Sequence, residues 1–177
     1  MHKLNEKLTR LEKYIDDKVA LLYPLPDSSQ RSLVKFTPWL SVILGLLSLV
    51  NLNSLWHNAH TANSLVYYAN TYSAVYHIPK VPVNLPHNFA FWVSIVLLII
   101  EALLFLGAYK DAKRKLKSGW DLIYYALLIN IVYGIFMLFS HYGGIGTLIA
   151  RIIFSSVCFY FLFQVRELYK KPKAKKS

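Results

Sequence analysis

The sequence predicts an all-α integral membrane protein: a bundle of four membrane-spanning helices preceded by an amphipathic helix. Three observations lead to this fold class. Of the 177 residues, 55% are hydrophobic and only 16% are charged, whereas about a quarter of the residues in a soluble domain are charged. Four apolar stretches reach the length of about 20 residues that a helix needs to cross the hydrocarbon core. The basic residues gather at one set of ends of these stretches, as in multi-span membrane proteins.

The four predicted spans are residues 36–56, 89–109, 120–140 and 145–165. Helices are expected because lipid offers no partners for backbone polar groups, and the alternating pattern of a barrel strand is absent. Thr37 followed by Pro38 predicts the start of the first span, with a capping residue and then proline at the first helical position. Ser118 and Asp121 have the spacing of a capping box at the start of the third span.

The lysines and arginines predict the orientation of the chain. Eighteen of the twenty lie in residues 1–35, in the connection 110–119 or in the basic tail 166–177. The two exceptions are Lys80, in an outer connection, and Arg151, inside a span. The positive-inside rule therefore predicts that both termini are cytoplasmic. We expect the cell membrane as the location, with the basic clusters facing the anionic lipids of the inner leaflet.

Residues 1–23 are predicted to form an amphipathic cytoplasmic helix, because an apolar residue recurs every three or four positions from Leu4 to Leu22. This helix could lie on the inner leaflet, pair with another copy, or pack on the cytoplasmic ends of the bundle. Its nearly balanced charge weakens the first alternative. Residues 24–35 begin with Pro24 and Pro26 and are predicted to be a linker.

Residues 57–88, between the first two spans, are predicted to form an outer cap. Ala59, Ala62, Val66 and Ala69 have helical spacing, which favours a short helix lying in the membrane interface. Tyrosines at 67, 68, 72 and 76 have the amphipathic rings that favour the headgroup zone. The prolines at 79, 82 and 86 predict an extended segment after that helix.

Five histidines fall on the outer side of this topology: His57, His60, His77, His87 and His141. Imidazole binds copper, nickel and zinc, and two histidines three residues apart can share one helical face. However, neither outer connection contains a carboxylate that could complete or orient such a site. We therefore expect interfacial or solvated histidines, with proton sensing as the functional alternative, and no metal or cofactor.

Glu101 is the main candidate functional residue, because it lies in the middle of the second span, where a carboxylate is costly. Arg151 is a candidate ion-pair partner, although the two residues differ in depth by about 9 Å at 1.5 Å per residue. Alternatively, Arg151 extends to the outer surface and Glu101 pairs with Asn130, a tyrosine or a water. Glu101 is expected either to hold helices together or to carry protons or ions.

Small residues predict where the helices approach closely. Ser41, Gly45 and Ser48 share one face of the first span, and Gly146 and Ala150 form a similar pair in the fourth.

The sequence contains no recognisable enzyme motif, and so apolar a chain is not expected to bind nucleic acid. We expect a non-catalytic membrane protein that assembles with itself or with a membrane-protein partner. One alternative is a subunit of a small proton- or ion-coupled transporter or channel that uses Glu101. Another is a membrane sensor or lipid-binding protein that uses the cap rich in tyrosine and histidine.

Overall fold

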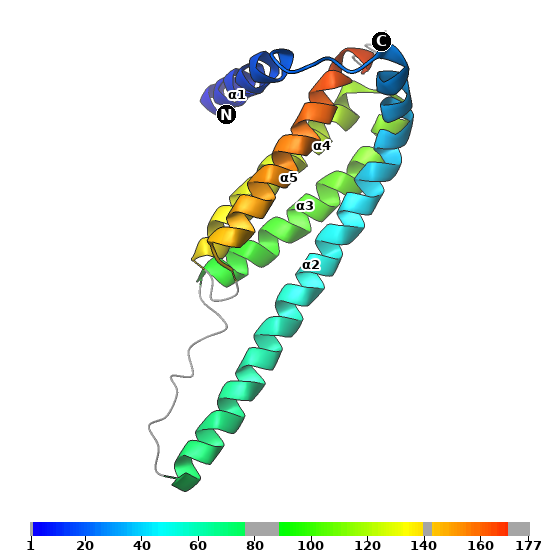
Figure 1. Ribbon diagram of the computed structural model, residues 1–177. Coiled ribbons are helices and arrows are strands. Elements are labelled where there is room, and N and C mark those ends of the chain that lie inside the picture. Colours follow the sequence, from blue (N-terminus) through cyan, green and yellow to red (C-terminus); the bar gives the residue numbers. More distant parts are fainter. Residues whose placement is uncertain (1, 77–88, 140–142, 170–177) are drawn as a thin grey trace.

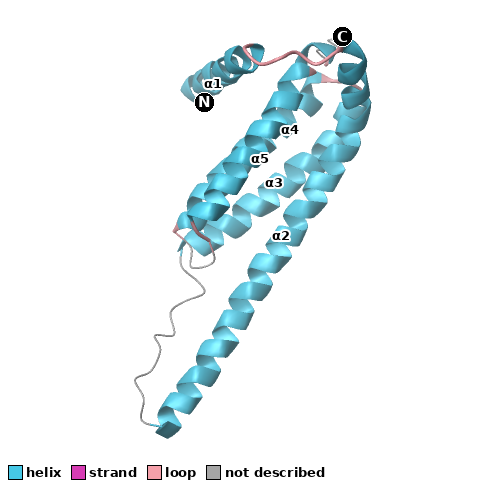
Figure 2. Ribbon diagram, viewed as in Figure 1, coloured by secondary structure: helices cyan, strands magenta, loops and turns pink. Residues whose placement is uncertain are grey.

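The computed structural model describes residues 2–76, 89–139 and 143–169 (Figure 1). The described chain is all-α and contains no strand, which confirms the predicted class (Figure 2). Its elements are α1 (His2–Ala20), α2 (Asp27–Tyr76), α3 (Phe89–Lys113), α4 (Lys117–Leu138), α5 (Ile145–Gln164) and a short 3-10 helix, η1 (Arg166–Leu168). The helices α2, α3, α4 and α5 are each long and apolar enough to cross a membrane.

The four long helices run alternately up and down and pack in chain order, with α3 between α2 and α4, and α5 against α4 (Figure 1). The helices α2 and α5 share no extensive contact. The bundle is therefore open between its first and last helices. We call the end where α2 begins and α5 ends the Arg166 end, and the opposite end the Phe89 end.

The first long helix begins earlier than predicted. α2 starts at Asp27 and includes Pro38, so the start predicted from Thr37 and Pro38 is wrong. Thr37 Oγ1 instead donates to Leu33 O at 2.8 Å, one turn back along the same helix. Asp27 supplies a negative charge at the helix start, where the helix dipole favours one. The non-helical connection is thus limited to the segment around Pro24 and Pro26.

The same helix also ends later than predicted. Residues 58–76 continue α2 without a break, so the separate interfacial helix expected there is wrong. Residues 51–76 contain neither glycine nor proline, and nothing in this stretch interrupts the hydrogen-bond ladder. The extended segment predicted from the three prolines lies outside the described residues.

The turn between α3 and α4 differs from the predicted capping box. α4 begins at Lys117 without a side-chain cap, and Ser118 Oγ donates to Asp111 Oδ2 at 2.6 Å. Lys115 has a φ of 55°, a left-handed conformation that reverses the chain within few residues. Ser118 therefore ties α4 back to the end of α3 instead of capping its own helix.

The amino-terminal helix packs on the bundle, which was one of the three alternatives. Arg166 donates to the carboxylates of Glu12 and Asp16 on α1, and Tyr160 Oη donates to Tyr23 O at 2.7 Å. Val19 is buried in the main hydrophobic cluster. These contacts dock α1 against the carboxyl-terminal part of α5, at the Arg166 end (Figure 1).

Candidate functional site

Glu101 lies at the midpoint of α3 and is only 2% exposed. Asn130 Nδ2 on α4 donates to Glu101 Oε1 at 2.8 Å. Ser48 Oγ on α2 lies 3.0 Å from both Glu101 Oε1 and Leu44 O, so its single proton serves one acceptor at a time. One carboxylate oxygen thus connects three helices.

The polar network reaches the fourth helix through Asn130. Ser155 Oγ on α5 lies 3.3 Å from Asn130 Oδ1 and can donate to it. Asn130 and Ser155 are buried, as are Ser48 and Glu101. The apolar stretches of all four long helices therefore each contribute one polar side chain to the same buried network.

Arg151 does not form the predicted ion pair with Glu101 in the described part of the chain. Its guanidinium instead lies over the Tyr133 ring, 4.8 Å from the ring centroid. Such a cation–π contact partly offsets the cost of a charge in an apolar setting. Of the two residues named as candidate partners of Glu101 by number, the structure brings Asn130 into hydrogen-bond contact and leaves Arg151 beyond ion-pair distance in the described chain.

Glu101 and Arg151 nevertheless border the same cavity, of about 280 Å³. Ser48, Asn51 and Asn130 also line it. Glu101 Oε2 is buried and has no hydrogen-bond partner among the described residues, whereas buried polar atoms are normally paired. One cavity at the centre of the bundle is therefore lined both by Glu101, which has an unpaired buried oxygen, and by Arg151.

Of the two predicted small-residue faces, one packs closely against a neighbouring helix and the other does not. A Cβ on Gly45 would lie 2.8 Å from Leu106 Cγ, so the face with Ser41 and Ser48 does pack closely on α3. Gly146 is exposed, and a Cβ there would have no neighbour within 4 Å among the atoms considered. The close packing predicted at Gly146 and Ala150 is therefore wrong for the described chain.

The predicted outer histidines form no metal-binding group in the described residues. His57 and His60 are exposed on α2. His77, His87 and His141 lie outside the described residues.

A second candidate surface lies on α2 beyond Ala59, the last α2 residue in the cluster that contains Phe91. Residues 60–76, the projecting segment, extend past the Phe89 end with no other described helix beside them (Figure 1). One face of this segment carries exposed large side chains at spacings of three and four residues: Leu65, Tyr68, Tyr72 and Val75, each 60–66% exposed. We call these four residues the outer stripe.

Sequence reasoning missed two features of these sites. It assigned Ser48 to packing only, although Ser48 occupies the same mid-helix depth as Glu101. It also gave no indication of the opening between α2 and α5, because residue spacing shows which face of a helix is polar but not which helices are neighbours.

Comparison of the chain with protein-family models, curated proteins and solved structures finds no significant match. Its function is therefore inferred from the residues and their geometry.

Proposed function

We propose that this chain is a non-catalytic, multi-span membrane protein that assembles with a second copy through the outer stripe. It resides in the cell membrane with both termini in the cytoplasm, as the distribution of the basic residues favours. The observation that carries the assembly role is the projecting segment, which presents exposed large apolar and aromatic side chains with no other described helix beside them.

The length of α2 supports this role. Its 50 residues correspond to about 75 Å of helix, whereas the hydrocarbon core is about 30 Å thick. A large part of α2 therefore lies outside the core, and the projecting segment lies on the side opposite the basic clusters. A helix gains most of its stability from packing, so a projecting helix with an apolar stripe is expected to pack against a partner.

The chemistry of the segment points to an uncharged contact. Residues 51–76 contain no lysine, arginine, aspartate or glutamate. Tyrosine is enriched in protein interfaces, where its ring buries apolar area and its hydroxyl stays hydrogen-bonded. Two copies inserted in the same orientation would bring equal positions of the stripe together around a two-fold axis.

Disulfide cross-linking tests this assembly. In a Cys158→Ser background, which removes the single native cysteine, we expect Tyr68→Cys to form a covalent dimer when membranes are oxidised. Tyr67→Cys is the matched control, because Tyr67 is the same residue type and is 70% exposed, against 60% for Tyr68, but lies about 100° around the helix. We expect at least about ten-fold more dimer from Tyr68→Cys on a non-reducing gel.

Equal cross-linking at the two positions, or none at either, would contradict assembly through the outer stripe. Equal reactivity would instead fit tyrosines that anchor the segment in the headgroup zone, as expected of a sensor or lipid-binding cap.

A second candidate function is proton- or ion-coupled transport through Glu101, favoured by its buried Oε2 without a described partner. Intramembrane carboxylates are common components of proton pathways. If this function holds, protein reconstituted in liposomes carries a proton flux that falls at least about ten-fold in Glu101→Gln. The control is Glu167→Gln, at an exposed residue in η1. A flux that persists in Glu101→Gln would rule this mechanism out.

A further inference from the structure

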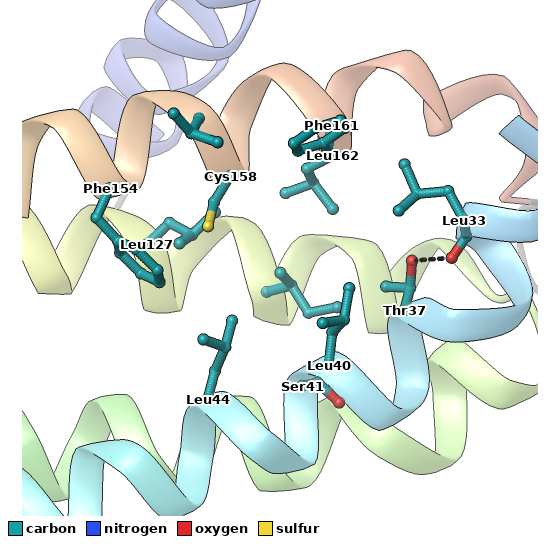
Figure 3. Close-up of a pocket in the computed structure, with 12 residues that line it drawn as sticks. Leu33, Thr37, Leu40, Ser41, Leu44, Leu127, Phe154, Cys158, Phe161 and Leu162 are labelled. Atoms are coloured by element: carbon teal, nitrogen blue, oxygen red, sulfur yellow. Dashed lines mark hydrogen bonds between the residues drawn. The ribbon is translucent and has the colours of Figure 1, made fainter. Parts of the chain in front are cut away.

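The open side of the bundle contains an apolar cavity of about 330 Å³. Side chains of α2 and α5, including Leu40 and Phe161, line it from opposite walls, and Leu127 of α4 lies between them (Figure 3). Leu44 and Phe154 border both this cavity and the polar cavity at Glu101. The two cavities therefore adjoin at these two side chains. We call the pair of cavities the groove, which is apolar toward the Arg166 end and polar at the middle of the bundle.

The groove opens to the outside of the bundle. Phe154, Val157 and Phe161 line the apolar cavity, yet they are 40%, 51% and 40% exposed. These residues belong to the apolar part of α5, so in an inserted protein the opening faces hydrocarbon. An occupant can therefore enter sideways from the bilayer.

The polar end of the groove offers both halves of a hydrogen-bond pair. Glu101 Oε2 is an acceptor with no described donor, and Arg151, whose guanidinium carries N–H donors and lies over the Tyr133 ring, also lines the cavity. Asn51 and Asn130 add amide groups. A hydroxyl group suits this set, because it donates one hydrogen bond and accepts others.

We propose that the groove binds a bilayer amphiphile that carries a hydroxyl group on a hydrocarbon chain. The hydroxyl lies between Glu101 and Arg151, and the chain lies against Leu40, Leu44 and Phe161. The two cavities together fall within the range of small-molecule sites, about 300–1,000 Å³, which are mostly apolar with a few polar groups that fix orientation. This site is independent of the outer stripe.

Two other occupants fit the groove less well. A plain hydrocarbon or a phospholipid acyl chain leaves Glu101 Oε2 without a donor, and an unpaired buried acceptor is unfavourable. A second copy docking through α5 would present Ile149, Ile153 and Val157, which are exposed but apolar and so bring no donor to Glu101.

Photolabelling of the purified full chain in phosphatidylcholine nanodiscs tests the proposal. The probe is hexadecanol with a diazirine in its chain, and labelled residues are identified by mass spectrometry. We expect labels in residues 40–44 and 154–161. Because a site built for a hydroxyl discriminates against analogues that lack one, unlabelled 1-hexadecanol should compete at a concentration at least about ten-fold lower than hexadecane. Equal competition by hexadecane, or labels confined to other surfaces, would overturn the proposal.

Matched variants localise the site. Val157→Trp fills the apolar cavity and should reduce labelling at least about ten-fold, whereas Ile149→Trp, at an exposed residue of the same helix that does not border this cavity, should leave labelling unchanged. Glu101→Gln should remove the advantage of hexadecanol over hexadecane. If Glu101→Gln does not fold, the Val157→Trp comparison and the competition in the unmodified protein decide the matter.

Labelling that is unchanged in Val157→Trp would overturn the proposal, as would a photo-induced dimer joined through residues 154–161. Cross-linking at residue 68 tests a different surface, the outer stripe. Failure of the assembly proposal is therefore distinguishable from failure of the groove proposal.

Discussion

Gly119→Ala is expected to destabilise the protein by about 3 kcal/mol or to prevent it from folding. A Cβ at this position would lie 2.3 Å from Ala112 N and 2.7 Å from Asp111 C. Both atoms belong to the backbone of α3, which cannot yield as the end of a flexible side chain can. The added methyl group must therefore push α4 away from α3, and overpacking of this kind costs about 1–3 kcal/mol, occasionally more.

The displacement would have further consequences. Gly119 is next to Trp120, which is fully buried in the main hydrophobic cluster. Ser118, on its other side, is hydrogen-bonded to Asp111. A shift of α4 at Gly119 therefore disturbs both contacts at once, and the measured cost should lie at the upper end of the range.

Gly107→Ala is the matched control, because Gly107 lies inside α3 and a Cβ there would meet no atom of the described chain within 4 Å, apart from its own stretch of helix. Alanine is favoured over glycine in a helix by up to about 1 kcal/mol, so this variant should be neutral or slightly stabilised. Thermal unfolding of both variants in the same detergent checks the pair. A Gly119→Ala protein as stable as Gly107→Ala would contradict the close contact between α3 and α4.

The sequence predicted the four long apolar helices because the length of an apolar run is set by local composition. It failed at Thr37 and Pro38, since the same two residues can start a helix or lie inside a longer one. The choice depends on whether residues 27–36 are helical, and only the packing of that segment decides it. Likewise, residues 58–76 have a helical pattern, but the pattern does not reveal that they continue the helix before them.

The candidate site was predictable where the depth of a residue within its predicted span decides which residues meet. Glu101 and Asn130 each lie near the middle of a predicted span, so adjacent helices bring them together whatever their exact tilt. Arg151 lies nearer the start of its span, and the resulting offset kept it from pairing with Glu101. The hydroxyl-binding groove could not be predicted, because it exists only where α2 and α5 fail to meet. That gap depends on the order in which four similar helices pack.

Trp120→Ala should cost about 3–5 kcal/mol, the usual range for removing a buried tryptophan. Trp120 is fully buried. Its ring stacks on Tyr124 at a centroid distance of 5.4 Å and meets Phe163 edge-on at 5.2 Å. Trp120 Nε1 also donates to Leu162 O at 2.9 Å. Alanine would remove these contacts and leave a cavity between α4 and α5.

The cost does not depend on the hydrophobic effect alone. Between helices surrounded by lipid, the contacts that a side chain makes within the protein are the main source of association. A void at Trp120 therefore lowers the stability of the protein, even where burial of the ring does not remove it from water. Trp120→Phe distinguishes the contribution of the ring from that of the N–H group, because phenylalanine keeps much of the stacking. This variant should cost about 1–2 kcal/mol for the lost hydrogen bond and the smaller ring.

Trp120 also connects the bundle to α1. Arg166, which holds Glu12 and Asp16 of α1, lies with its guanidinium 5.5 Å from the Trp120 ring centroid. Trp120→Ala should therefore loosen α1 as well, seen as faster proteolysis between residues 20 and 27. Trp56→Ala, at a tryptophan that is 53% exposed, should leave both the unfolding temperature and the proteolysis rate nearly unchanged. If Trp120→Ala lowers stability while α1 stays protected, Arg166 alone holds the helix and the ring contributes only to the core.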